Sequence, residues 1–148
     1  MIESLLALAL LLPGVQDGVK RSELHTVVDD VCHVATTEEP LHFSDDDESN
    51  RERTARVLLV WSFFESAWKP YARSGPYIGA TQVHQAHLLH TTKEVLKSRQ
   101  VGLREGLRVL RNDVQECGSI RGGLNRYSSG DCAKKLSLVS MRCKYIGC

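Results

Sequence analysis

The stretch over residues 50–68, NRERTARVLLVWSFFESAW, constrains the fold of this chain more than any other. One face of the predicted helix carries four large apolar side chains, Val57, Trp61, Phe64 and Trp68. The residues between them widen this stripe until little polar surface is left. A helix that is apolar nearly all round must be covered by other elements. The stretch therefore predicts a central, buried helix.

Other segments also show helical rather than alternating periodicity. We expect helices over residues 1–12, 22–36, 84–99 and 101–117, with turns over 71–82 and a helix or turn in GGLNRYSSGDC. The acidic run over residues 45–48 is typical of a solvated helix start, where the helix dipole favours acids. No segment alternates as a strand. At 148 residues, the chain predicts one mainly α-helical domain with a substantial core.

The N-terminal segment, residues 1–20, begins with the apolar run MIESLLALALLLPG. It resembles the apolar part of a signal peptide but has Glu3 instead of a basic start and lacks a small-residue cleavage site. It is shorter than the roughly 20 residues that span a bilayer. We expect a helix that ends at Pro13-Gly14 and packs against this domain or docks on a virion or envelope partner. A signal-like or anchoring role is the alternative.

Charge and cysteine content narrow the function classes. The formal net charge is +1, and the chain has no Lys/Arg block, so we expect no nucleic-acid partner. The chain has five cysteines but no CxxC pair, which argues against zinc. Cys117 and Cys132 bracket one segment, and Cys143 and Cys148 close the chain. One or two disulfides in an oxidising setting, or reduced structural thiols, both fit this pattern.

Three histidines, His84, His87 and His90, follow one another at three-residue intervals. Over those intervals the side chain rotates roughly 240° around a helix, so the three would not meet at one metal ion. The acidic run lacks the glycine and distal glutamate of a calcium loop. We therefore expect no metal site and no cofactor.

Glu65 is the carboxylate at the end of the apolar run, and Pro70 follows it closely. Pro70 disfavours helical geometry at Lys69, so we expect the helix to end at Trp68 and a cleft to open there. Apolar surroundings disfavour the ionised form of a carboxyl group, which lets it hold and deliver a proton at neutral pH. Glu65 is thus a candidate general acid. The alternative is a glutamate that reaches into solvent from the end of a core helix.

The segments around Glu65 resemble the lytic transglycosylase family, the soluble type with a goose-type-lysozyme-like fold. ESAWKPYARS and GPYIGATQV follow that family's order of a Glu-Ser helix end, a proline, a serine and a glycine turn that runs into Gly-x-x-Gln. The matching residues are Glu65-Ser66, Trp68, Pro70, Ser74, Gly75, Gly79 and Gln82. VGLREGLRVL and GLNRYSSG resemble two later motifs through Gly106, Leu110, Leu124, Tyr127 and Gly130. The chain departs from the family at Thr81, Gly102 and Ser128.

The resemblance implies a lysozyme-like helical domain over residues 21–148, built around a buried central helix that carries the catalytic glutamate. It implies cleavage of the β-1,4 bond between N-acetylmuramic acid and N-acetylglucosamine in peptidoglycan glycan strands. Glu65 would act as acid and then as base, giving a 1,6-anhydro product, and Tyr127 would position it. The substrate-binding residues would be Ser74, Gly79, Gln82, Tyr127 and Ser128.

The spacing of the acidic residues in the sequence favours a catalytic mechanism that uses one carboxylate. Hydrolases that use two carboxylates hold them about 5–9.5 Å apart, yet no acidic residue lies between Glu65 and Glu94. The expected setting is a tail-associated virion protein that opens the wall locally, or a periplasmic or extracellular enzyme. The alternatives are a structural or assembly protein that retains the fold with little activity, and a hydrolytic lysozyme of the same fold.

Overall fold

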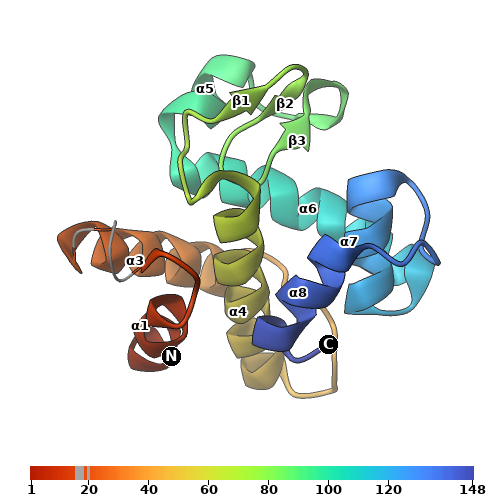
Figure 1. Ribbon diagram of the computed structural model, residues 1–148, viewed down its shortest axis with the longest axis horizontal. Coiled ribbons are helices and arrows are strands. Elements are labelled where there is room, and N and C mark those ends of the chain that lie inside the picture. The colour runs from red at the N-terminus through yellow and green to blue at the C-terminus, as the bar shows by residue number, and fades with distance from the viewer. Residues whose placement is uncertain (16–18, 20) are drawn as a thin grey trace.

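The computed structural model describes residues 1–15, 19 and 21–148 of the chain, and it is mainly helical as predicted (Figure 1). The helices are α1 (Ile2–Leu10), α3 (Arg21–Thr37), α4 (Asp47–Ser66), α5 (Thr92–Lys97), α6 (Arg99–Cys117), α7 (Ile120–Ser129) and α8 (Ser137–Ile146), with a 3-10 turn, η1 (Gln85–His87). In Figure 1, α4 runs through the centre, with α1 and α3 on one side and α8 on the other.

A small sheet forms in the segment where the sequence analysis found turns and no alternating strand pattern. Three two-residue strands, β1 (Arg73–Ser74), β2 (Tyr77–Ile78) and β3 (Val83–His84), form an antiparallel sheet in the order β1-β2-β3. This sheet lies beyond the C-terminal end of α4 (Figure 1). Strands this short show no alternation in the sequence, because their pairing depends on the turns between them.

α4 is the buried central helix that its composition predicts. Every residue from 57 to 62 is buried, and Trp61 is fully enclosed. The acidic run before it is the helix start, as expected, because the Asp46 side chain caps α4 by accepting a hydrogen bond from Ser49 N at 3.0 Å. The apolar surface of α4 therefore joins the layers of the molecule into one core.

α4 ends at Ser66, two residues earlier than predicted. Ala67 and Trp68 take left-handed backbone angles, with φ of 52° and 62°, and the Ala67 N–H closes the helix on Phe63 O. The Trp68 ring folds back and is buried, and its Nε1 donates to Leu59 O at 2.8 Å. The chain therefore turns because Trp68 packs on its own helix, before the restriction from Pro70 applies.

The N-terminal helix is part of the same core. α1 packs on α3 and α4 and buries Leu5, Leu8 and Ala9. Ile2 of this helix and its neighbours Met1 and Leu11 remain exposed. The helix expected at this end is therefore present and packs against this domain. The domain boundary expected after residue 20 lies outside the described residues, which omit 16–18 and 20.

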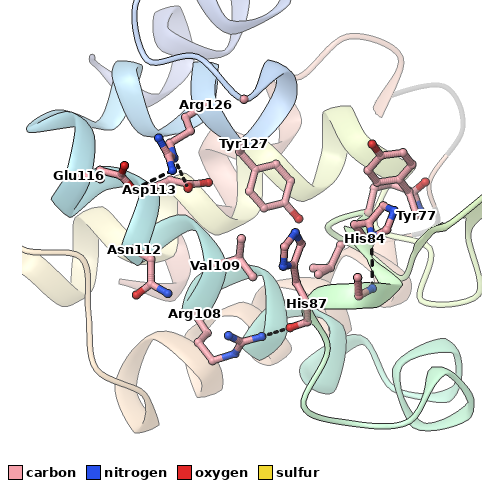
Figure 2. Close-up of a pocket in the computed structure, with 14 residues that line it drawn as sticks. Tyr77, His84, His87, Arg108, Val109, Asn112, Asp113, Glu116, Arg126 and Tyr127 are labelled. Atoms are coloured by element: carbon pink, nitrogen blue, oxygen red, sulfur yellow. Dashed lines mark hydrogen bonds and ion pairs between the residues drawn. The ribbon is translucent and has the colours of Figure 1, made fainter.

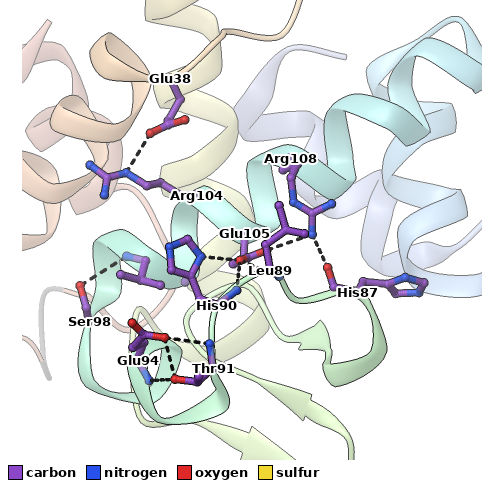
Figure 3. Close-up of polar contacts among 12 residues, drawn as sticks. Glu38, His87, Leu89, His90, Thr91, Glu94, Ser98, Arg104, Glu105 and Arg108 are labelled. Carbon is purple, nitrogen blue, oxygen red and sulfur yellow. Dashed lines mark hydrogen bonds and ion pairs between the residues drawn. The ribbon is translucent and has the colours of Figure 1, made fainter.

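The continuous helix expected over residues 84–99 is wrong. The chain forms η1, then a loop, and restarts as α5 with a capping box in which Thr91 and Glu94 bind each other's backbone N–H. The loop is held by Glu105 of α6, whose carboxylate accepts from Leu89 N and His90 N at 3.0 and 2.8 Å (Figure 3). A buried carboxylate on another helix thus competes with helical hydrogen bonding here.

Both disulfides that the cysteine spacing allows are present. Cys117 bonds to Cys132, which ties the end of α6 to the segment after α7. Cys143 bonds to Cys148 and closes the tail behind α8. Cys32 is a free, buried cysteine of α3. The alternative with all thiols reduced does not describe this structure.

Candidate functional site

A cavity of about 450 Å³ opens beside Glu65 at the last turn of α4. Its lining comes from α4, the small sheet, α7 and α8, and consists of Glu65, Ser74, Tyr77, Gln82, Tyr127, Ser128 and Leu138. Five of the six residues that the motifs nominate therefore meet at one cavity. Glu65 is the carboxylate among these lining residues.

Gly79, the sixth nominated residue, does not line the cavity. It is buried in the turn between β2 and β3 with a φ of 79°, and a Cβ there would lie 2.6 Å from Val95 Cγ1. Both the backbone angle and the space therefore require glycine. Gly79 shapes the wall of the cavity without facing it.

Two side chains hold the Glu65 carboxylate. Trp61 Nε1 donates to Glu65 Oε1 at 3.2 Å, and Arg142 Nη1 of α8 lies 2.8 Å from the same oxygen as an ion pair. The Arg142 side chain is only 1% exposed, and that of Glu65 is 18% exposed. The expectation of purely apolar surroundings is wrong, since a buried guanidinium and an indole N–H both lie against the carboxylate. The sequence reasoning did not find Arg142.

Tyr127 lies beside Glu65 but does not bond to it in the recorded contacts. Its hydroxyl donates to Thr81 O at 3.1 Å, and its ring meets Trp61 edge-on with centroids 4.7 Å apart. Burial, and then the charge of Glu65, raise the pKa of Tyr127 well above its ordinary value, so the hydroxyl keeps its proton. The positioning role expected of Tyr127 is thus not exercised through a printed hydrogen bond to Glu65, which accepts from Trp61 instead.

The turn over residues 79–82 is fixed to the end of α4. Ser66 Oγ donates to Ala80 O at 2.7 Å. This hydrogen bond explains why a serine follows Glu65 at the end of the helix. Gln82 has a φ of 53°, and its Nε2 donates to Gly79 O at 2.9 Å. Left-handed angles at a non-glycine residue cost free energy and cluster at functional sites. The strain at Gln82 lies on the cavity wall.

Two of the departures from the family pattern contact each other. Thr81 Oγ1 donates to Gly102 O at 2.8 Å, and both residues are buried. A Cβ on Gly106 would lie 2.3 Å from Thr81 Oγ1, so this glycine allows α6 to approach the turn closely. The third departure, Ser128, is exposed at the cavity.

Replacing Gly106 by alanine is expected to destabilise the fold by about 1–3 kcal/mol, because the added methyl group collides with Thr81. Helix propensity alone would give the opposite sign, a gain of about 1 kcal/mol. Chemical denaturation measures the change, with the exposed Gln115→Ala on the same helix as control. A stabilised Gly106→Ala protein would show that the close contact is not maintained in solution.

A second cavity of about 560 Å³ adjoins the first and shares Tyr77, Gln82 and Tyr127 with it (Figure 2). His84 lies between Tyr77 and His87, with ring centroids 5.3 and 5.8 Å from theirs. The two cavities adjoin through these shared residues, and both have aromatic and polar side chains in their walls.

Acidic groups that the sequence reasoning missed line the second cavity. Asp113 accepts from Arg126 at 3.1 Å, and Arg126 also pairs with Glu116 (Figure 2). Burial raises the pKa of Asp113, and the nearby Arg126 opposes this rise. No motif marks Asp113, because its environment depends on how α6 and α7 pack.

No protein-family model, curated protein or solved structure matches this chain. Within residues 1–15, 19 and 21–148, no helix is long and apolar enough to cross a membrane. The same residues contain no group of three or more histidine, cysteine, aspartate or glutamate side chains placed to hold a metal ion. The functional argument therefore depends on the motifs and on the geometry around Glu65.

Proposed function

We propose that this chain cleaves peptidoglycan glycan strands as a lytic transglycosylase, with a lysozyme-like fold and Glu65 as its single acid and base. One observation carries the proposal. Residues nominated by sequence motifs on separate segments, Glu65, Ser74, Gln82, Tyr127 and Ser128, line one cavity.

The shape of the site suits a polymer. The cavity at Glu65 and the second cavity share three lining residues, and we propose that a strand lying across Glu65 passes these residues into the second cavity. Exposed Tyr77 offers a flat apolar ring between the two, while Gln82 and Ser74 offer polar groups. Sugar rings present apolar faces and a rim of hydroxyl groups, which such a mixture can bind.

The proposed chemistry uses no water. Protonated Glu65 gives its proton to the glycosidic oxygen as the bond from that oxygen to C1 of N-acetylmuramic acid breaks. The resulting carboxylate takes the proton from the C6 hydroxyl of the same sugar, whose oxygen bonds to C1 and closes the 1,6-anhydro ring. Glu65 ends the cycle protonated. Among the described residues, no other carboxylate lines the cavity at Glu65, which supports this route.

The proposal is tested with purified peptidoglycan and the full chain. We expect the turbidity of a sacculus suspension to fall and soluble muropeptides to appear. An unchanged suspension across acidic and neutral pH would contradict enzymatic cleavage, and would favour the alternative of a structural or assembly protein with this fold.

A hydrolytic lysozyme is the second candidate function, and the adjoining cavity favours it through Asp113. This partly buried carboxyl group lines the space into which the strand would extend. Hydrolysis would require Asp113 to activate a water molecule. In the structure, the Asp113 carboxylate accepts a hydrogen bond from Arg126. The end group of the product distinguishes the two reactions.

The proposed setting is the virion tail, where local wall opening is needed, or the periplasmic or extracellular space. Two disulfides are compatible with such oxidising settings. The proposed contact with a virion or envelope protein is made by exposed apolar side chains at the two ends of α1, namely Met1, Ile2 and Leu11.

A further inference from the structure

The two oxygens of the Glu65 side chain have different surroundings. Trp61 Nε1 donates to Oε1 at 3.2 Å, and Arg142 Nη1 lies 2.8 Å from the same oxygen. Within the described residues, Oε2 has neither a hydrogen bond nor an ion pair. The side chain of Glu65 is 18% exposed and lines the cavity at the end of α4. Oε1 is therefore the anchored oxygen, and Oε2 is the oxygen left available to a ligand.

Trp61 is held in place by the core of the protein. It precedes Glu65 by four residues on α4, so both side chains lie on one face of the helix. Its ring is fully enclosed and meets the Tyr127 ring edge-on, with centroids 4.7 Å apart. Trp61 itself does not line the Glu65 cavity. Because a close-packed ring has little freedom to move, its N–H is a fixed donor.

A fixed donor matters for Glu65 because a glutamate side chain can rotate among several staggered conformations. A general acid must hold its proton within hydrogen-bond reach of the reacting atom. A displacement of about 1 Å can lower the rate about 100-fold. The bond from Trp61 selects the conformations of Glu65 in which Oε1 faces the indole. The other oxygen, Oε2, is then held in place before a ligand arrives.

We infer that Trp61 is a positioning residue that anchors Glu65 Oε1 and thereby presents Oε2 as the oxygen that exchanges the proton with the glycan. The sequence motifs assign the positioning role to Tyr127, whose hydroxyl donates to Thr81 O instead. The inference rests on the proposed function for its consequence in catalysis. The contact between Trp61 and Glu65 belongs to the protein itself and is measured without substrate.

The chain has two tryptophans, and the second supplies the matched control. Trp61→Phe removes the N–H that reaches Glu65 but keeps an aromatic ring in the core. Trp68→Phe removes a buried indole N–H that donates to a backbone oxygen, Leu59 O, at 2.8 Å. Both variants lose part of a buried ring and one hydrogen bond, so they differ chiefly in the acceptor that is left behind. Arg142 stays unchanged, because replacing it would alter the charge at the site as well as the geometry.

We expect kcat of Trp61→Phe on soluble glycan strands to fall about 10- to 100-fold, because Oε2 is no longer held at the scissile bond. KM should stay within about twofold of the wild type, since Trp61 does not line the cavity. Trp68→Phe should keep a kcat close to that of the wild type. Should Trp61→Phe fail to fold, benzothienylalanine at residue 61 keeps the two-ring shape with sulfur in place of the N–H. A folded variant at residue 61 with wild-type kcat, or an equal fall in the Trp68→Phe protein, overturns the inference.

The readout without substrate is the indole N–H signal of Trp61 in a proton–nitrogen NMR spectrum. The full chain gives one such signal for each tryptophan, and the two phenylalanine variants assign them. Glu65→Gln replaces the carboxyl group by an amide and should move the Trp61 signal more than the Trp68 signal. Equal or absent movement overturns the inference, whatever the activity. A Trp61 signal that moves in a protein that cleaves no peptidoglycan supports the anchoring of Glu65 and contradicts the proposed function instead.

Discussion

Glu65→Gln is expected to lower kcat/KM on peptidoglycan by at least about 100-fold, because glutamine can neither donate nor accept the proton that the reaction moves. The substitution keeps the size of the side chain and an oxygen that can accept from Trp61 Nε1. Because the substitution also leaves the buried Arg142 guanidinium without its charge partner, we expect a lower stability as well, and activity is compared at a temperature where the variant is folded. Release of soluble muropeptides from sacculi measures the activity, with thermal unfolding as the check on folding.

The matched control for this prediction is Glu52→Gln, an exposed substitution on the same helix. It should clear peptidoglycan as the wild type does. Equal activity of the Glu65→Gln and wild-type proteins would contradict the assignment of Glu65 as the general acid.

Glu105→Ala is expected to destabilise the protein by about 2–3 kcal/mol, since it leaves a set of donors without their acceptor. The carboxylate is almost fully buried and accepts from Leu89 N, His90 N, His90 Nδ1 and Arg108 Nη2 (Figure 3). Chemical denaturation measures the loss. The exposed Glu116→Gln, which weakens a surface ion pair, should cost no more than about 1 kcal/mol.

Glu105 also predicts how stability depends on pH. Burial raises its pKa, but the hydrogen bonds from His90 and Arg108 and from the backbone outweigh burial and bring the pKa below its ordinary value. Its contribution to stability is thus present above the unfolded-state pKa of about 4.3 and is lost as pH falls through the lower folded-state pKa. The deficit of Glu105→Ala should shrink below about pH 4. A deficit that stays constant down to pH 2 would contradict this account.

The features that the sequence could predict are those that depend on local pattern. The apolar run over residues 50–68 required a buried helix, and the structure has one. The helix expected to end at residue 117 does end there, and Gly118 takes a left-handed angle as its cap. The spacing of Cys117 and Cys132 allowed the disulfide that is present. Each of these signals is carried by a few residues close together in the chain.

The features that the sequence could not predict depend on contacts between distant segments. Arg142 lies 77 residues after Glu65 in a tail without a motif, and only the packing of α8 on α4 brings the two together. The loop after η1 has a helical sequence pattern, but its backbone N–H groups at Leu89 and His90 donate to Glu105 of another helix. The early end of α4 likewise depends on the Trp68 ring, which bonds to a carbonyl nine residues earlier.

The measurement that tests the central claim most directly is mass spectrometry of the muropeptides that the wild-type protein releases from purified peptidoglycan. The account predicts products whose N-acetylmuramic acid ends carry a 1,6-anhydro ring, because the C6 hydroxyl and not water attacks C1. Reducing ends that have gained water would contradict it and would make the protein a hydrolase.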